Sequence, residues 1–106
     1  MPRVREYLAR EFKVDEAGVQ DWAQHWHRAA LTGLEEHLAT EKETGTYCQG
    51  EQITIADICL ASQAAGAKFF NVDTAPFPNF VRITSALQQI DAFARAHPLK
   101  QPGAPA

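Results

Sequence analysis

The sequence predicts an all-α fold in which amphipathic helices pack around one central, buried helix. Two observations predict this fold class. Apolar residues recur at three- and four-residue steps along most of the chain, which is the spacing of one helix face. The run from Ile55 to Phe70 is apolar nearly all round, and a helix of that kind is normally buried. The one alternating stretch, around Tyr47, has no partner strand, so we interpret Gly45 to Gln52 as a turn or loop.

Two amphipathic helices are expected before this central helix. The first spans Arg3 to Phe12, with an apolar side made of Val4, Tyr7, Leu8 and Phe12. The second is expected to begin after Asp15, whose side chain suits an N-cap, and to run to about Glu43. Its apolar stripe comprises Val19, Trp22, Trp26, Ala29, Ala30, Gly33, Leu34 and Leu38. The opposite side is expected to face solvent and carries Glu35, Glu36, Glu41, Lys42 and Glu43.

The clearest local signal is the start of the central helix. Thr54 is a typical N-cap residue, and the Asp57 carboxylate can reach back to the backbone N–H of residue 54, which completes a capping box. Ile53 and Ile58 occupy the two positions of a hydrophobic staple around it. We expect the Thr54/Asp57 pair to be buried and structural, because it satisfies backbone donors that water would not reach.

Two shorter helices are expected after a proline-containing loop. Pro78 suits the first position of a helix, whose apolar side comprises Phe80, Ile83, Leu87 and Ile90. Asp91 is expected to cap a last short helix, which ends at His97 because a proline follows. We therefore expect one helical domain over residues 1–98 and a Pro-rich tail over 99–106, extended on the surface or without regular structure.

Composition and charge narrow the class of function. The net charge is −3 and the 10 Lys and Arg residues are scattered, which argues against a nucleic-acid surface. No stretch approaches the ~20 apolar residues of a membrane span. The first residues lack the apolar region of a signal peptide, so the expected location is cytoplasmic. Cys48, in the turn, and Cys59, in the central helix, are expected to be reduced, with Cys59 packed as a small hydrophobe.

We expect neither a metal site nor a catalytic residue in this chain. His25 and His27 are two positions apart on a helix, so they point to different sides, and zinc needs three or four convergent ligands. Trp22 and Trp26 stand at helical spacing beside alanines and are interpreted as core residues rather than as an aromatic platform. Ser62 has no base within reach by sequence and is interpreted as structural.

Four strings along the chain resemble one enzyme family. Residues 50–60, GEQITIADICL, resemble the capping-box segment of the glutathione transferase C-terminal helical domain. Residues 22–26, WAQHW, and 70–78, FNVDTAPFP, resemble segments of bacterial zeta-class members, as does the ending with Ala92-Phe93, His97-Pro98 and Gln101-Pro102. The four strings occur in the family's order, and the resemblance extends from Arg3 to Pro105. The zeta class includes maleylacetoacetate and maleylpyruvate isomerases.

The resemblance implies the helical C-terminal domain of a zeta-class glutathione transferase, without the N-terminal thioredoxin-like domain. In the family that other domain holds glutathione and carries the serine or cysteine that activates the thiol. We therefore expect this chain alone to bind no cofactor and to be inactive, to supply part of the substrate wall, and to form homo-oligomers through its first two helices. The alternative is a freestanding module for protein–protein interaction, because helical domains of the superfamily also serve as docking units.

The resemblance also points to a substrate pocket walled by Gly66, Phe69 and Tyr7, with core packing of Phe69 as the competing interpretation. Family isomerases place an arginine directly before the phenylalanine of the 70–78 string, where it can hold a substrate carboxylate through two hydrogen bonds. Here that position is Phe69. Because one residue along a helix turns by about 100°, we expect the adjacent Lys68 to point elsewhere. A flatter, less charged electrophile than maleylacetoacetate would fit Phe69 better.

Overall fold

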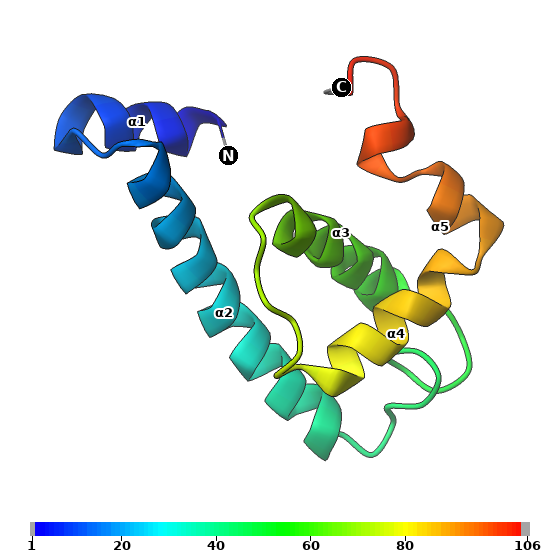
Figure 1. The fold of residues 1–106 in the computed structure, drawn as a ribbon. Helices are drawn as coiled ribbons and strands as arrows, with labels where there is room; N and C mark the ends of the chain where they lie inside the picture. Colours follow the sequence, from blue (N-terminus) through cyan, green and yellow to red (C-terminus); the bar gives the residue numbers. More distant parts are fainter. Residues whose placement is uncertain (1, 105–106) are drawn as a thin grey trace.

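The structure is a computed structural model that describes residues 2–104 as helices joined by loops (Figure 1). In chain order the elements are α1 (Pro2–Phe12), α2 (Glu16–Thr40), α3 (Ile55–Phe69), α4 (Pro78–Gln88), α5 (Asp91–Arg95) and the 3-10 helix η1 (Pro98–Lys100). The region around Tyr47 has only isolated bridges and no strand, as predicted. The all-α fold class is confirmed. None of the helices described is long and apolar enough to cross a membrane.

The core lies where α2, α3 and α4 meet, with α4 packed against both of the other helices (Figure 1). It comprises Leu31, Leu38, Cys48, Leu60, Ala67, Val72, Phe77, Phe80, Ile83 and Leu87. Phe80, Ile83 and Leu87 are nearly inaccessible to solvent and recur at three- and four-residue steps, so one side of α4 forms the centre of this core, as the sequence predicted. Burying each such side chain contributes about 1.5–3 kcal/mol relative to leaving it exposed.

Helix α3 forms after its predicted N-cap, Thr54, and ends at Phe70 as expected, but it is not enclosed on every side. Its buried side, with Leu60 and Ala67, faces the core. On its other side Ile55 is 78% exposed and Phe69 is 60% exposed. The prediction of a helix buried all round is therefore wrong for this chain. The reason is that α2 and α4 cover one side of α3 only, whereas the sequence pattern was apolar on both sides.

Helix α2 buries only part of the predicted stripe. Val19 and Leu38 are buried as predicted and Leu34 packs against the core, but the other buried residues, Ala23 and Leu31, were not in that stripe. Trp26 is 55% exposed, and Ala29, Ala30 and Gly33 are also at the surface. Trp22 is half-buried and meets Trp26 edge to face, with ring centroids 6.5 Å apart. The interpretation of both tryptophans as core residues is therefore wrong for Trp26, because the described helices leave its side of α2 uncovered.

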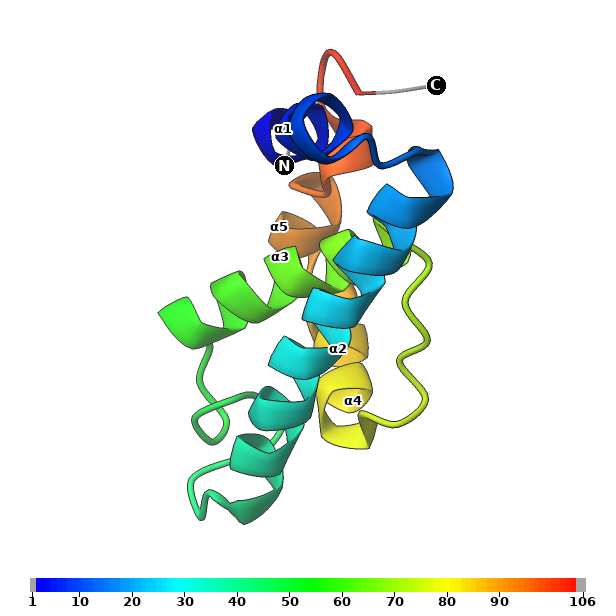
Figure 2. The same ribbon diagram turned by 90° about the vertical axis from the view of Figure 1, so that its left-hand side faces the viewer.

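Helix α1 forms as predicted, but none of its described residues is buried. Val4, Tyr7 and Phe12 are all exposed. Figures 1 and 2 show α1 at the same end of the molecule as the C-terminal segment, away from the core. The radius of gyration is 15.3 Å, whereas a compact chain of this length has about 13 Å. The extended position of α1 contributes to this difference.

The sequence suggested that Glu35 lies on the solvent-facing side of α2, but in the structure it contacts α4. Its carboxylate accepts hydrogen bonds from the backbone N–H of Asn79 at 2.8 Å, the Asn79 side chain at 2.9 Å and the Phe80 N–H at 2.8 Å. These donors belong to the first turn of α4, where backbone N–H groups lack partners within the helix and the helix dipole favours a negative charge. Glu35 thus caps α4 from another helix, which is why no local sequence pattern marks it.

The C-terminal segment is more regular than predicted. Ile90 is the N-cap of α5, and Asp91 is its first residue. After His97 the chain forms η1 instead of an extended tail. The side chain of Gln101 donates to the carbonyl oxygens of Arg95 and His97 at 2.8 and 3.2 Å, which holds η1 against the end of α5. The remainder of the predicted tail, residues 105–106, lies outside the described residues.

Candidate functional site

The capping box at the start of α3 is formed, with Asp57 buried and Thr54 half-buried. Asp57 is 0% exposed, and its Oδ2 accepts from the backbone N–H of Thr54 at 2.9 Å and from the Thr54 hydroxyl at 3.3 Å. Its Oδ1 accepts from the backbone N–H of Cys48 at 2.9 Å. The sequence predicted the contact with the Thr54 N–H, which is local, but not the one with the Thr54 hydroxyl. It did not predict the contact with Cys48, which fixes the preceding loop to the same carboxylate.

Two pKa values respond to this arrangement. Burial raises the pKa of Asp57, but the hydrogen bonds from Cys48 and Thr54 outweigh it and leave the pKa below its ordinary value. Burial, with the hydrogen bond to Asp57 and the negative charge of Asp57, raises the pKa of the Cys48 thiol to about 12. The carboxylate is therefore ionised and the thiol protonated at neutral pH, so Cys48 is no nucleophile here.

The sequence suggested that Cys59 is the buried cysteine, but the structure buries Cys48 instead. Cys48, in the loop, is buried, and Cys59, in α3, is exposed. Both are free thiols, as predicted. The prediction that Cys59 packs as a small hydrophobe is wrong because its position on α3 falls on the side that α2 and α4 leave uncovered.

Two adjoining hollows follow the exposed side of α3. The first has a volume of about 430 Å³ and is lined by Ile53, Ile58, Ala61, Ser62, Ala65, Gln88, Ala92, Phe93, Ala96, His97 and Pro98. The second, of about 460 Å³, is lined by Ser62, Ala65, Gly66, Lys68, Phe69, His97, Pro98 and Leu99. We call the two together the trough, since they share four lining residues. Volumes of this size are typical of ligand pockets.

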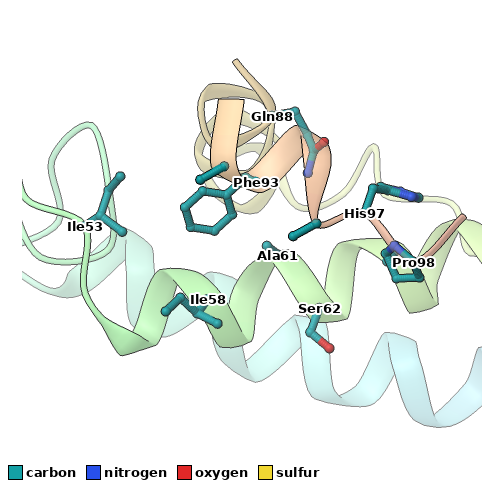
Figure 3. Close-up of a pocket in the computed structure, with 11 residues that line it drawn as sticks. Ile53, Ile58, Ala61, Ser62, Gln88, Phe93, His97 and Pro98 are labelled. Carbon is teal, nitrogen blue, oxygen red and sulfur yellow. The ribbon is translucent and has the colours of Figure 1, made fainter. Parts of the chain in front are cut away.

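The trough lies between α3 and the segment that contains α5 and η1. Figure 3 shows Phe93 and His97 on the α5 side, across from Ile58 and Ala61 on α3. None of these residues was among the predicted site residues. One side of the last short helix carries three apolar residues at helical spacing, Ala92, Phe93 and Ala96. The spacing did not predict which other helix this side would contact.

The predicted pocket residues separate into two places. Gly66 and Phe69 both line the second hollow of the trough. Tyr7 lies on α1, where its ring meets Phe12 edge to face at 5.9 Å, and it lines neither hollow. Lys68, expected to point elsewhere, lines the same hollow as Phe69. A long lysine side chain on an open helix surface can reach a neighbouring position, so the turn of the helix alone did not exclude it.

Helix α2 holds the C-terminal turn of α3 in place. The side-chain amides of Gln20 and Gln24 both donate to the carbonyl oxygen of Phe70, at 2.9 and 2.8 Å. This oxygen lies at the end of α3, where carbonyl groups have no partner within the helix. The two glutamines therefore fix the turn that carries Lys68 and Phe69.

Gly66 lies on α3 close to a side chain of α2. A Cβ atom at this position would lie 3.1 Å from Nε2 of His27. The His27 ring is fixed, because Nδ1 donates to the Ala23 carbonyl at 2.9 Å and the ring packs against Phe70 with centroids 5.4 Å apart. Gly66 thus has a structural reason to be glycine besides lining the trough.

Polar groups are few in the trough. They are the side chains of Ser62, Gln88, Lys68 and His97. His97 is already engaged, since its Nδ1 accepts the backbone N–H of Leu99 at 3.2 Å and so caps η1. Over residues 2–104 no three His, Cys, Asp or Glu side chains converge as metal ligands. His25 stacks edge to face on Trp26, whereas His27 faces α3, so the two histidines do point to different sides.

Curated relatives of this chain are isomerases. The maleylpyruvate isomerase of a Ralstonia species is 37% identical over 100 residues, which cover 94% of this chain and 47% of that protein. The probable maleylacetoacetate isomerase 2 of Drosophila melanogaster is 40% identical over 92 residues, covering 87% of this chain and 40% of that protein. The chain thus spans less than half the length of these relatives. No family model matches the sequence.

Solved structures agree with these relatives. The maleylacetoacetate isomerase of Methylobacterium extorquens AM1, with bound malonate and GSH, superposes with a TM-score of 0.94 at 40% identity and covers 100% of this chain and 50% of that chain. The holo structure of a maleylpyruvate isomerase, a bacterial zeta-class glutathione transferase, has a TM-score of 0.92 at 36% identity, covering 97% and 49%. The chain is therefore a relative of the zeta-class glutathione transferases, which include maleylacetoacetate and maleylpyruvate isomerases, and it has the fold of their C-terminal helical domain.

Proposed function

We propose that this chain is the substrate-side domain of a glutathione-dependent cis–trans isomerase and is not catalytic by itself. The observation that carries the proposal is the match to isomerases over almost the whole chain, together with an apolar trough on the same helical domain. In that reaction glutathione supplies a thiolate that adds to an activated double bond, permits rotation and leaves. A thioredoxin-like domain would supply the site for it.

The trough itself does not suit glutathione. Glutathione carries two carboxylates and an ammonium group, which need several charged or polar partners. The trough offers one ammonium group, that of Lys68, and its other lining residues are mostly apolar. Nor does its lining include a cysteine that could serve as a thiol. This distribution supports a division of labour in which the described residues bind and orient the substrate and exclude water from it.

The second part of the proposal concerns self-association. Val4, Tyr7 and Phe12 on α1 and Trp26 on α2 are exposed apolar side chains. Exposed apolar surface that is contiguous over several hundred Å² is usually covered by association. We therefore expect homo-oligomers through α1 and α2. Sedimentation velocity over a range of concentrations would measure this, and a monomer at every concentration would contradict it. The cytoplasmic location stays a prediction.

The function is tested by comparing the chain alone with the chain joined to a zeta-class thioredoxin-like domain. Glutathione and maleylpyruvate are added to each protein, and the appearance of the trans product is followed by absorbance. We expect no turnover above buffer for the chain alone and clear turnover for the joined protein. Turnover by the chain alone would show that it is catalytic. A joined protein that folds but gives no turnover with maleylpyruvate or maleylacetoacetate would contradict the isomerase assignment.

A further inference from the structure

Helix α3 ends in a turn that its own backbone closes. The N–H of Val72 donates to the carbonyl oxygen of Ala67 at 2.8 Å. The N–H of Asn71 donates to the carbonyl oxygen of Lys68 at 3.1 Å. Asn71 itself has a φ of 56°, in the left-handed region. These features define a Schellman motif, in which the carbonyl of the C-cap residue, here Phe70, has no partner within the helix.

Helix α2 supplies two donors to this one carbonyl oxygen. Gln20 and Gln24 lie one helical turn apart, and their side-chain amides donate to the Phe70 oxygen at 2.9 and 2.8 Å. Together they occupy both of its lone pairs. The Gln24 amide also lies 3.4 Å from the carbonyl oxygen of Asn71. One donor would satisfy the oxygen. Two donors from the same helix also fix the direction of this carbonyl, and with it the backbone of the turn.

The ring of Phe70 connects α2 to the exposed ring of Phe69. It packs against the ring of His27 on α2, with centroids 5.4 Å apart. It also meets the Phe69 ring edge to face, with centroids 5.0 Å apart and an angle of 87° between the planes. Phe69 is 60% exposed, and an exposed side chain has several staggered rotamers open to it. Contact with a fixed neighbouring ring therefore limits the directions that the Phe69 ring can take.

We propose that Gln20 and Gln24 are positioning residues that orient Phe69 through Phe70. By holding the Phe70 backbone they keep the Phe69 ring in the direction in which it forms part of the substrate wall. The place of Phe69 in that wall rests on the proposed function. Neither glutamine has to touch the substrate for this role. Without them the turn would present the wall in only a fraction of the molecules, and the apparent affinity falls in proportion to that fraction.

The orientation of Phe69 is measured on the full chain by NMR. Three-bond couplings about its Cα–Cβ bond report whether the ring holds one rotamer, and deuterium exchange of the Val72 amide reports opening of the turn. Wild type should show one rotamer and slow exchange. The double variant Gln20→Ala/Gln24→Ala should show averaged couplings and exchange faster by about tenfold, the effect of about one net hydrogen bond.

The matched control for these couplings is Glu35→Ala. Glu35 also lies on α2 and also bonds to backbone groups of another element, but those groups belong to α4. Its loss should destabilise the domain and leave the Phe69 couplings at their wild-type values.

The effect on recognition is measured as KM and kcat for maleylpyruvate in the joined protein. The double variant should raise KM about two- to tenfold and change kcat by less than about twofold, because bound substrate selects the oriented turn. A double-mutant cycle then tests the route through the ring. When Phe69→Ala has already removed the ring, loss of both glutamines should raise KM no further. Glu35→Ala should leave KM unchanged.

Two kinds of result would overturn the positioning role. One is a Phe69 ring that already averages over rotamers in wild type, or that keeps one rotamer in the double variant. The other is a KM that does not rise, or that rises equally with and without Phe69, which would be a general effect of destabilisation. A joined wild-type protein without turnover would instead contradict the isomerase assignment, and the couplings and the exchange would still decide whether the two glutamines orient Phe69.

Discussion

Replacing Asp57 by alanine tests whether the buried carboxylate organises the start of α3 and the loop before it. The substitution removes the acceptor for the backbone N–H groups of both Cys48 and Thr54. Cys48 is only 6% exposed, so water has little access to its N–H. A buried donor without a partner costs about 1–3 kcal/mol. Losing the hydrogen bond from the Thr54 N–H, which is one half of the capping box, costs about 1 kcal/mol.

Together these effects predict that Asp57→Ala lowers the free energy of unfolding by about 2–4 kcal/mol. For a domain of this size each kcal/mol lowers the melting temperature by about 4–8 °C. Asp57→Asn should fall between wild type and alanine, because its one carbonyl oxygen can still accept from one of the two N–H groups while its amide group faces the other.

The matched control is Asp15→Ala at the start of α2. Asp15 is also an aspartate at a helix N-terminus and accepts the Gly18 N–H at 2.8 Å, but it is exposed. Its loss should cost about 1 kcal/mol. Thermal and urea unfolding followed by circular dichroism would measure all three variants beside wild type. If Asp57→Ala and Asp15→Ala cost the same, burial of the carboxylate adds nothing and the reasoning fails.

Four further predictions follow from particular contacts. Glu35→Ala should cost about 2–3 kcal/mol in urea unfolding, because hydrogen bonds to a charged acceptor are lost at the start of α4; a loss below that of a surface substitution would contradict the cap. Since the pKa of Asp57 is lowered on folding, its contribution should be full above about pH 4 and decline as pH falls through the folded-state pKa, so melts from pH 7 to pH 3 should show a steeper decline for wild type than for Asp57→Asn. With the pKa of Cys48 raised to about 12, iodoacetamide at pH 8 should label the exposed Cys59 in the folded protein and Cys48 only after unfolding, as mass spectrometry would report; equal labelling of both would refute the buried thiol. Gly66→Ala should raise the free energy of unfolding by about 1 kcal/mol, through the better helix propensity of alanine, only when His27→Ala removes the neighbouring ring. An equal gain with and without His27→Ala would show that the ring moves aside at no cost.

Local signals were enough wherever the physics is local. The N-cap at Thr54, the proline that begins α4 and the periodic apolar side of Phe80, Ile83 and Leu87 were all readable, because caps and helix faces depend on residues within one or two turns. The same holds for Asp57 and its contact with Thr54. The family resemblance rested on such short strings and was confirmed.

Long-range contacts were not readable in the same way. Asp57 holds the Cys48 N–H, and Glu35 caps a helix more than forty residues away along the chain, through pairs that no spacing rule connects. Of the predicted pocket, Gly66 and Phe69 fell in one hollow, whereas Tyr7 lies on a helix that lines neither. His97 and Phe93 entered the trough only because the chain returns past α3 after α4.

The sequence by itself determined that the chain forms helices, where most of them begin and end, and which enzyme family it resembles. The tertiary structure decided which part of the apolar surface of α2 is buried, which side of α3 remains open, and which cysteine is protected. The physical reason is that periodicity states that a face is apolar, but burial depends on whether another element covers that face. On α2 and α3 more faces are apolar than the described helices can cover.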